Sequence, residues 1–364
     1  MTNRTAPVRV LVVDDSAVMR QLLSTLLEAD PEIQVVGTAA DPHIARERIK
    51  SLNPDVVTLD VEMPHMDGLT FLRKIMALRP MPVVMISTLT QSGAETTLEA
   101  LEVGAVDFIA KPSGDIAHGL GELAEELQRK VKAAAAVRVG ARRPVAAPRE
   151  RRVDRTRRPT GKIIFIGAST GGVEALKAVL MGMPADCPPT LITQHMPPRF
   201  TTGFAERLSR QCPPTVVEAA HDDVIQPGHV YIAPGSHHLE IVRVGGRHIC
   251  RLSDGPPVSG HRPSVDVLFR SAARVCGNTA VGAILTGMGK DGAEGLLEMR
   301  QAGAMTLGQD EETALIYGMP RVAFERGAVI QQCSLGHMAD AILDACEREP
   351  SDAGSHGRHD ASAA

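Results

Sequence analysis

Short apolar runs alternate with amphipathic stretches along the first third of the chain. The runs lie at residues 8–13, 33–38, 55–60, 82–87 and 105–110, and the stretches between and after them carry apolar residues at helical spacing. Strands that are apolar throughout are typical of a parallel sheet buried on both faces. Five such repeats predict a (βα)5 domain over residues 1–130.

The same alternation resumes at Lys162 and ends near Glu349. Strands are predicted at residues 163–166, 190–194, 279–285, 304–307 and 328–331. Between residues 215 and 251 the pattern changes to short runs with turns (HVYIAP, HHLEIVRV, GGRHICRL), which predicts antiparallel hairpins added to the sheet. We therefore predict a second α/β domain over residues 161–349, with a doubly wound, mostly parallel sheet and a small antiparallel hairpin region.

Residues 131–160 separate the two predicted domains and differ from both in composition. The segment is rich in Ala, Arg and Pro, with nine arginines from Arg138 to Arg158 against Glu150 and Asp154. We interpret it as a solvated flexible linker, although the positive strip could also contact acidic receptor, nucleic-acid or membrane surfaces. No aromatic residues are interleaved to stack on bases, so we expect no nucleic-acid binding. Residues 350–364 are predicted to be a disordered tail.

Composition excludes several classes of protein. A length of 364 residues suits two domains, and a net charge of −4 gives no general attraction to nucleic acid. The chain has no run of 18 apolar residues, and its first residues lack the apolar segment of a signal peptide. The six cysteines show no CxxC spacing, so we expect reduced thiols rather than disulfides or zinc ligands. These features predict a cytoplasmic protein with no membrane insertion.

Acidic and polar side chains follow several strands of the first predicted sheet. Asp14 and Asp15 follow the first strand, Asp60 ends the third, Ser87 ends the fourth and Lys111 follows the fifth. The carboxyl ends of parallel strands meet at one edge, where clustered carboxylates suit Mg²⁺ and a phosphate. One carboxylate could then accept a phosphoryl group while the lysine stabilises its charge. Acids at strand ends can also be merely solvated or cap helices, but these positions together favour a phosphoacceptor site.

The second domain begins with a serine on a tight strand-to-helix turn, in KIIFIGASTGG. Such a turn holds the Ser169 hydroxyl out at the sheet edge, where it can act as a nucleophile. His195 follows the predicted strand TLITQ and could serve as base at the same edge. Asp291, in the glycine-rich turn of ILTGMGKDGAEG, could orient the imidazole, and backbone N–H groups around Met288 could form an oxyanion hole.

The same glycine-rich turn supports a competing interpretation. Gly287, Gly289 and Gly292 match the dinucleotide-binding spacing GxGxxG, with Asp310 about twenty residues further on. An oxidoreductase is therefore an alternative. Against it, the domain does not begin with this unit, and the other glycine-rich loop carries Ser169 where the motif needs its second glycine.

Residues 8–130 resemble the response-regulator receiver domain, through VVDDS, LDVEMPHMDG, MIST and AKPS. The resemblance implies that Asp60 is the phosphoacceptor and that a histidine kinase is the phosphodonor. It also implies that Asp14, Asp15 and Asp60, with a backbone carbonyl near Glu62, hold Mg²⁺.

The receiver resemblance assigns three further positions. Ser87 and Lys111 correspond to the switch hydroxyl and the lysine of the family. Phe108 occupies the switch aromatic position and lacks a phenolic hydroxyl, so a hydrogen bond from that position is unavailable.

Residues 162–349 resemble the catalytic domain of the chemotaxis protein-glutamate methylesterase (CheB) family. The matching stretches are IGASTGG, QHMPPRFT, YIAPGSHHLE, GPPVSGHRPSVDVLF, ILTGMGKDGAEG and TALIYGMPRVA. The resemblance implies that Ser169 is the nucleophile, His195 the general base and Asp291 the orienting acid. It also places Thr170 beside the nucleophile and the Met288 N–H at the oxyanion.

The function implied by both resemblances is a phosphorylation-activated serine hydrolase. It would remove methyl groups from glutamate γ-methyl esters of chemoreceptors, releasing methanol, and would deamidate receptor glutamines. The unphosphorylated receiver would cover the active site. Arg199, Arg262 and Arg270 are candidates for contacting an acidic receptor helix. A non-enzymatic response regulator that acts through protein or nucleic-acid contacts is the alternative from another class, and the basic linker is its only support.

Overall fold

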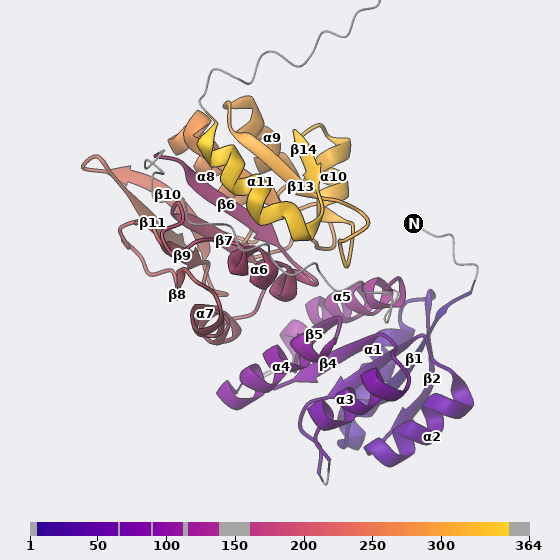
Figure 1. Ribbon diagram of the computed structural model, residues 1–364. Helices are drawn as coiled ribbons and strands as arrows, with labels where there is room; N and C mark the ends of the chain where they lie inside the picture. Colours follow the sequence, from indigo (N-terminus) through magenta and orange to yellow (C-terminus); the bar gives the residue numbers. More distant parts are fainter. Residues whose placement is uncertain (1–5, 65, 89, 112–115, 138–160, 349–364) are drawn as a thin grey trace, which may run out of the picture.

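The computed structural model describes residues 6–64, 66–88, 90–111, 116–137 and 161–348, and these form two α/β units (Figure 1). The predicted tail and most of the predicted linker lie outside the described residues. Helix α5 (Ile116–Ala135) continues past residue 130, where the first domain was expected to end.

The first unit is a five-stranded parallel sheet in the order β2-β1-β3-β4-β5. The strands are β1 (Val8–Val13), β2 (Ile33–Ala39), β3 (Val56–Asp60), β4 (Val83–Ser87) and β5 (Asp107–Ala110). The helices are α1 (Ala17–Glu28), α2 (Pro42–Leu52), α3 (Gly68–Leu78), α4 (Gln91–Val103) and α5. The strand order reverses between β1 and β3, and ligands of such folds bind outside the carboxyl ends of the strands at that point.

The second unit is a seven-stranded sheet in the order β14-β13-β12-β6-β7-β9-β8, parallel throughout. Its strands are β6 (Ile163–Ala168), β7 (Thr190–Gln194), β8 (Thr215–Glu218), β9 (His229–Ile232), β12 (Ala280–Ile284), β13 (Met305–Gln309) and β14 (Gln331–Cys333). Its helices are α6 (Gly172–Met181), α7 (Phe200–Gln211), α8 (Val265–Cys276), α9 (Ala293–Gln301), α10 (Met319–Glu325) and α11 (Leu335–Glu347), with a short 3-10 turn at Gly277–Thr279.

The α/β prediction is confirmed, with a correction in the hairpin region. Only β10 (His238–Val244) and β11 (Arg247–Ser253) form an antiparallel hairpin, and it is a separate two-stranded sheet. β9 instead lies inside the main sheet, parallel to β7 and β8. Most of β9 is buried, but a short apolar run does not show which strands it pairs with or in which direction.

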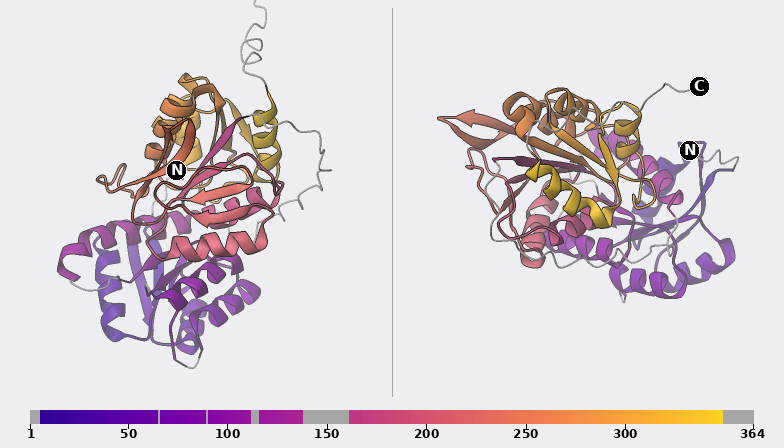
Figure 2. Two further views of the ribbon diagram at one scale, coloured as in Figure 1. Left: turned by 90° about the vertical axis from the view of Figure 1, so that its left-hand side faces the viewer. Right: turned by 45° about the horizontal axis from the view of Figure 1, so that its top comes forward.

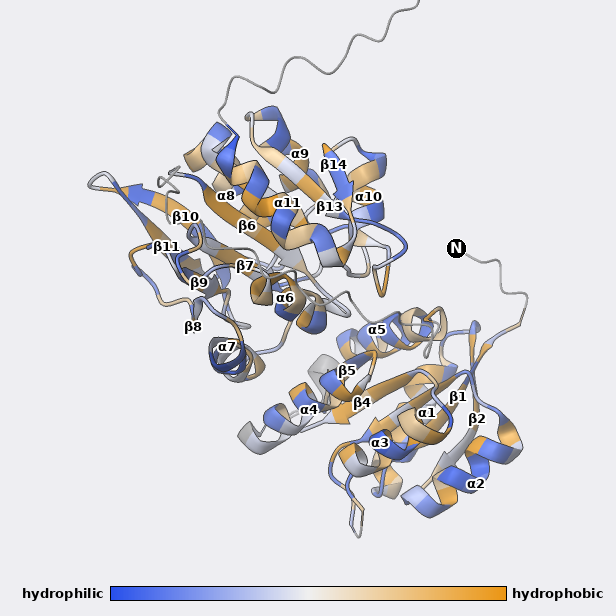
Figure 3. Cartoon of the chain, viewed as in Figure 1, coloured by the Kyte–Doolittle hydropathy of each residue, from blue (hydrophilic) through white to orange (hydrophobic). Residues whose placement is uncertain are grey.

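The apolar core continues from one unit into the other. Strands β4 and β6 are mostly apolar in Figure 3, and one buried cluster includes Leu98 and Phe108 of the first unit together with Phe200 and Phe204 of the second. Helices α4 and α7 lie side by side at this junction in Figures 1 and 2. The two units are thus docked over a buried apolar surface.

All six cysteines are free, and five of them are buried. Within the part of the chain that the structure describes, no helix combines the length and apolarity needed to cross a bilayer.

Candidate functional site

Ser169 lies directly after β6, at the carboxyl edge of the second sheet. Its N–H donates to Thr286 O at 3.0 Å, and Gly172 N–H donates to Ser169 O at 2.7 Å, which closes the turn into α6. Gly171 has a φ of 77°, a conformation in which glycine is preferred. The strand-to-helix turn predicted for this segment is confirmed, and it leaves Ser169 only 7% exposed.

Three of the predicted side chains meet at this edge. The Oγ of Ser169 lies 3.2 Å from Nδ1 of His195, and Nε2 of His195 lies 2.8 Å from Oδ2 of Asp291. His195 follows β7 and Asp291 follows β12, the strands on either side of β6. Neighbouring parallel strands therefore bring together residues that are far apart in the sequence.

The contacts determine which nitrogen of His195 carries the proton. An ionised carboxylate only accepts hydrogen bonds, so Nε2 is the protonated nitrogen that donates to Asp291. In the neutral ring Nδ1 is then an acceptor, and it faces the Ser169 hydroxyl. This arrangement can remove a proton from Ser169.

Asp291 is held by donors from the start of helix α8. Ser264 Oγ donates to Oδ1 at 2.8 Å, Val265 N–H to Oδ2 at 2.7 Å and Asp266 N–H to Oδ1 at 3.1 Å. Burial alone would raise the pKa of Asp291, but the hydrogen bonds from His195, Ser264 and Val265 together lower it. The carboxylate therefore stays charged beside His195.

His261 is a neighbour of this cluster that the sequence did not single out. Its ring stacks on that of His195, with centroids 3.8 Å apart and planes 17° from parallel. Burial lowers the pKa of His261, and a charge on His195 lowers it further, so His261 is neutral. It lies in a turn of the sequence, and no pattern there distinguishes it from the other turn histidines.

Gly287, next to Met288, lies against the nucleophile turn. A Cβ at Gly287 would stand 2.8 Å from Ser169 Cβ and 2.3 Å from Met319 Sδ. Met288 is thus beside Ser169 in the fold, while its oxyanion role stays a prediction. Thr170 is also adjacent, but its hydroxyl donates to Asp107 of β5, in the first unit.

The first unit covers this edge of the second sheet. Phe108 stacks on Phe200, with centroids 4.5 Å apart, and Lys130 of α5 forms an ion pair with Asp107 at 3.2 Å. Asp107 and Phe108 line the same cleft as Ser169 and His195, and its cavity is about 20 Å³. That space admits about one water molecule, so a larger substrate cannot enter this arrangement.

Glu102 of α4 anchors the two units through charge. It pairs with Lys177 of α6 at 2.8 Å and with Arg207 of α7, whose Nε donates to Oε1 at 3.0 Å. Burial would raise the pKa of Glu102, but the two cations outweigh it and lower the pKa to about 2.

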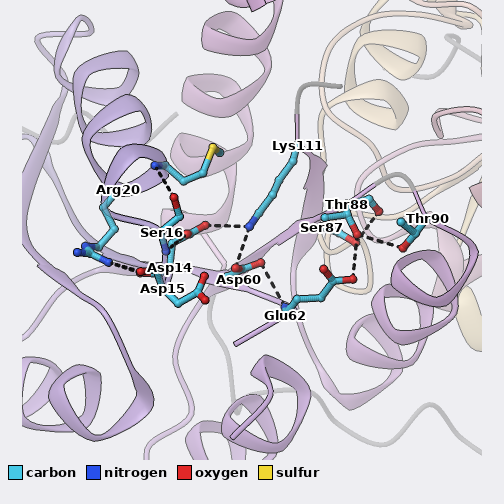
Figure 4. Close-up of polar contacts among 11 residues, drawn as sticks. Asp14, Asp15, Ser16, Arg20, Asp60, Glu62, Ser87, Thr88, Thr90 and Lys111 are labelled. Carbon is cyan, nitrogen blue, oxygen red and sulfur yellow. Dashed lines mark hydrogen bonds and ion pairs between the residues drawn. The ribbon is translucent and has the colours of Figure 1, made fainter. Parts of the chain in front are cut away.

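The acidic residues of the first unit also meet, at the switch point between β1 and β3 (Figure 4). Asp14, Asp15 and Asp60 each place a carboxylate oxygen within 4.8 Å of the others. Lys111 Nζ lies 2.8 Å from Asp60 Oδ2 and 3.1 Å from Asp14 Oδ2. The site is therefore a cluster of oxygen ligands with one adjoining cation.

The surroundings of Asp60 disfavour the ionised form of its carboxyl group. Burial raises its pKa most, the charge of Asp14 adds to this and Lys111 opposes it, with a net pKa of about 6. A divalent cation would offset the repulsion, and oxygen-only ligands suit Mg²⁺. The residues present fit that ion.

Two hydroxyls follow each other at the end of β4. Ser87 is fully buried, accepts a hydrogen bond from Thr97 at 2.7 Å and donates toward Gly93 O, so its hydroxyl is directed at α4. Thr88 donates to the Glu62 side chain at 3.0 Å (Figure 4). In this arrangement Ser87 is thus engaged with α4.

The three candidate arginines do not share one environment. Arg270 pairs with Glu298 at 2.9 Å, and Arg262 donates to the carbonyls of Asp254 and Gly255. Arg199 has a φ of 74° at the start of α7. Arg262 and Arg270 thus make different kinds of contact, one to backbone carbonyls and one to a carboxylate.

Comparison with known proteins identifies both units. A family model described as CheB methylesterase matches residues 164–342, and one described as response regulator receiver domain matches residues 10–118. A protein named protein-glutamate methylesterase/protein-glutamine glutaminase 1 from Caulobacter vibrioides is 59% identical over 343 residues, covering 93% of this chain and 98% of its own.

The chain belongs to the CheB methylesterase family. A relative of the same name from Xanthomonas campestris pv. campestris is 55% identical, over 93% of this chain and 97% of its own. The crystal structure of the Thermotoga maritima CheB methylesterase catalytic domain matches with 34% identity and a TM-score of 0.50, covering 50% of this chain and 98% of that domain. The family resemblance predicted from the motifs is thereby confirmed.

Family membership sets aside the oxidoreductase alternative. The structure gives a physical reason, because Ser169 and Met319 occupy the space beside Gly287 that a dinucleotide would need. Asp310 likewise accepts local bonds from the N–H and hydroxyl of Thr313.

Proposed function

We propose that this protein hydrolyses glutamate γ-methyl esters on chemoreceptors and deamidates receptor glutamines, under control of its receiver domain. The observation that carries the proposal is the hydrogen-bonded row Ser169–His195–Asp291 in a member of the CheB methylesterase family. Relatives over nearly the whole chain have methylesterase and glutaminase in their names.

In the proposed reaction Ser169 attacks the ester carbonyl while Nδ1 of His195 takes the hydroxyl proton. Asp291 stabilises the imidazolium and keeps the ring oriented. His195 then gives its proton to the leaving oxygen, and methanol departs from a glutamyl-enzyme intermediate. Water attacks this ester with His195 again as base, which restores Ser169 and leaves a glutamate. With a glutamine substrate the same steps release ammonia.

The oxyanion of the tetrahedral intermediate needs donors beside Ser169. The N–H of Met288 is our candidate, because Gly287 brings that loop against Ser169. Thr170 is the second support residue. Its hydroxyl donates to Asp107 in the docked arrangement, so undocking of the receiver would release it.

Asp60 is the proposed phosphoacceptor, with a histidine kinase as phosphodonor. Asp14, Asp15 and Asp60, with a backbone carbonyl near Glu62, would hold Mg²⁺, which when bound neutralises charge on the transferred phosphoryl group. Lys111 already lies at hydrogen-bonding distance from Asp60 and would pair with the phosphate. Ser87 would turn from α4 to the phosphate and draw its loop inward.

Regulation follows from the docked arrangement. Phe108 and Asp107, which contact the second unit, are on β5, and Lys111 follows this strand directly. A rearrangement at Ser87 and Lys111 can therefore reach the interface through α4 and β5. Phosphorylation needs to favour the undocked state by only a few kcal/mol to expose Ser169.

We place this activity in the cytoplasm, where the kinase and the receptor domains would be accessible. Arg199 and Arg262 stay candidates for contacting an acidic receptor helix. Arg270 stays a candidate as well, and its ion pair with Glu298 would have to open for such a contact.

The test is methanol release from methylated receptor membranes, with and without Mg²⁺ and a small phosphodonor. We expect release that rises with phosphodonor in the wild type and is lost in Ser169→Ala. Asp60→Asn should keep the basal release and lose the stimulation. Phosphorylation-dependent binding to a partner without any methanol release would favour the non-enzymatic response regulator instead.

A further inference from the structure

The N-terminus of helix α8 is capped in an unusual way. Ser264 occupies the N-cap position, yet its hydroxyl accepts no bond from the N–H groups of the first turn. Serine at this position ordinarily accepts such a bond. Here Val265 and Asp266 donate their N–H groups to the carboxylate of Asp291 instead. The hydroxyl of Ser264 is thus released for another partner.

That partner is Asp291 itself. Ser264 Oγ donates to Oδ1, the oxygen that also accepts the Asp266 N–H, whereas His195 and Val265 bond to Oδ2. The last torsion of an aspartate side chain is soft, so a carboxylate can rotate unless both of its oxygens are held. The bond from Ser264 therefore helps to keep Oδ2 directed at His195.

Ser264 is itself fixed within the protein. It is fully buried, and its N–H donates to Nδ1 of His238 at 3.1 Å. His238 is also buried, and its Nε2 donates to Pro256 O at 3.1 Å. The position of Ser264 is thus set by a second row of hydrogen bonds behind Asp291.

We propose that Ser264 is a positioning residue for the hydrolysis at Ser169, holding Asp291 oriented and ionised so that Asp291 orients His195. The inference rests on the proposed function, because Ser264 acts only through the row Ser169–His195–Asp291. A hydrogen bond to a charged group is stronger than one between neutral groups, and the helix N-terminus adds to its effect.

Other titratable groups face this row. His261 stacks on His195, and Asp266 stands beside Asp291 with a pKa that burial raises and the charge of Asp291 raises further. Arg129 and Lys130 of α5 act on His261 from the receiver side. Substitutions at Ser264 leave all of these groups in place, so a changed pH profile reports on Asp291 and His195.

The experiment is steady-state methanol release by the full-length protein from methylated receptor membranes, with Mg²⁺ and phosphodonor, over a range of pH. For Ser264→Ala we expect a kcat about tenfold below wild type, with KM changed less than about twofold. The acidic limb of the kcat/KM profile should move to higher pH, because a carboxylate with fewer donors holds the imidazolium proton more strongly. Ser264→Thr keeps a hydroxyl and should recover most of the rate.

Ser271→Ala is the matched control. Ser271 lies on the same helix and is as deeply buried, but its hydroxyl donates to Leu268 O at 2.7 Å and accepts from Ile241 N–H at 3.0 Å. This variant should lose stability while keeping the kcat and the pH profile of the wild type. Thermal unfolding checks that each variant is folded. Should Ser264→Ala not fold, Ser264→Gly removes the same hydroxyl at a position where glycine is tolerated.

A double-mutant cycle with Asp291→Asn gives the deciding result. If Ser264 acts through Asp291, then Ser264→Ala causes no further loss in that background. The inference is overturned if Ser264→Ala has the wild-type kcat and pH profile, or if its full loss persists in the Asp291→Asn background. The proposed function fails separately, if wild type releases no methanol or if Ser169→Ala still does.

Discussion

The reactivity of Ser169 depends on a few atoms held in fixed orientation. Nδ1 of His195 faces the hydroxyl because Nε2 is hydrogen-bonded to Asp291. Asp291 in turn accepts a hydrogen bond from the start of α8. The ring of His261 restricts His195 from its face. A small rotation of either imidazole would misalign the proton transfer, and misplacement by about 1 Å can cost about a hundredfold in rate.

His261→Ala is therefore expected to lower kcat by up to about tenfold, because stacked aromatic pairs contribute about 0.5–1.5 kcal/mol. His261→Phe keeps a flat ring and should stay within about threefold of wild type. The measurement is methanol release at saturating substrate. His229→Ala, which removes a ring stacked on Tyr231 away from the site, is the control. Equal rates for His261→Ala and wild type would contradict the positioning effect.

The site is built by the turns that follow three neighbouring strands. β6, β7 and β12 are neighbours, so the turns after them converge on one edge of the sheet. The turn after β12 approaches the Ser169 turn closely enough that Gly287 leaves no space for a side chain. The backbone of this loop is thereby placed beside the nucleophile.

Gly287→Ala should displace Ser169 or Met319 and reduce kcat by about a hundredfold, with a loss of about 1–3 kcal/mol in the free energy of unfolding. Kinetics and denaturant unfolding measure the two effects. Gly121→Ala, on α5 with open space around it, should leave both nearly unchanged or increase stability slightly. A fully active Gly287→Ala protein would show that the loop can move without harm.

Docking of the receiver sets the state of the whole molecule. Phe108 packs on Phe200, Asp107 accepts from Thr170, and Glu102 bridges two helices of the second unit. These contacts cover Ser169 and leave a cavity too small for a receptor side chain. The equilibrium between docked and undocked states is thus the quantity that phosphorylation has to change.

Glu102→Gln should weaken docking and raise basal methanol release several-fold in the absence of phosphodonor, because it removes the charge between Lys177 and Arg207. Glu32→Gln is the control, since Glu32 pairs with Lys132 inside the receiver. An unchanged basal rate in Glu102→Gln would show that the apolar contacts alone hold the receiver in place.

Docking should also weaken at low pH. The pKa of Glu102 is lowered to about 2 in the docked state, so its contribution is fully present above its ordinary pKa and is lost as the pH falls toward 2. Small-angle scattering should show the two units of the wild type separating as the pH falls from 4.5 toward 2. In Glu102→Gln this component of the pH dependence should be absent.

Local patterns in the sequence were enough to predict the two α/β units and the candidate residues. Apolar runs at regular spacing specify buried parallel strands, and Ser169, His195, Asp291 and Asp60 are recognisable because each stands at a strand end or in a glycine-rich turn. Periodicity is local information, so it is readable without knowing which strands are neighbours. The same limit explains the error over β9, whose parallel partners lie elsewhere in the chain.

Which side chains contact one another depends on how the strands and the two units pack. The stacking of His261 on His195, the bonds of Ser264 to Asp291 and the contact of Thr170 with Asp107 all join residues from different elements. None of them leaves a periodic signal, because a side-chain contact depends on how strands order in a sheet and how two domains dock. Those arrangements follow from burial of apolar surface summed over the whole chain, and they fix whether Ser169 is covered or exposed.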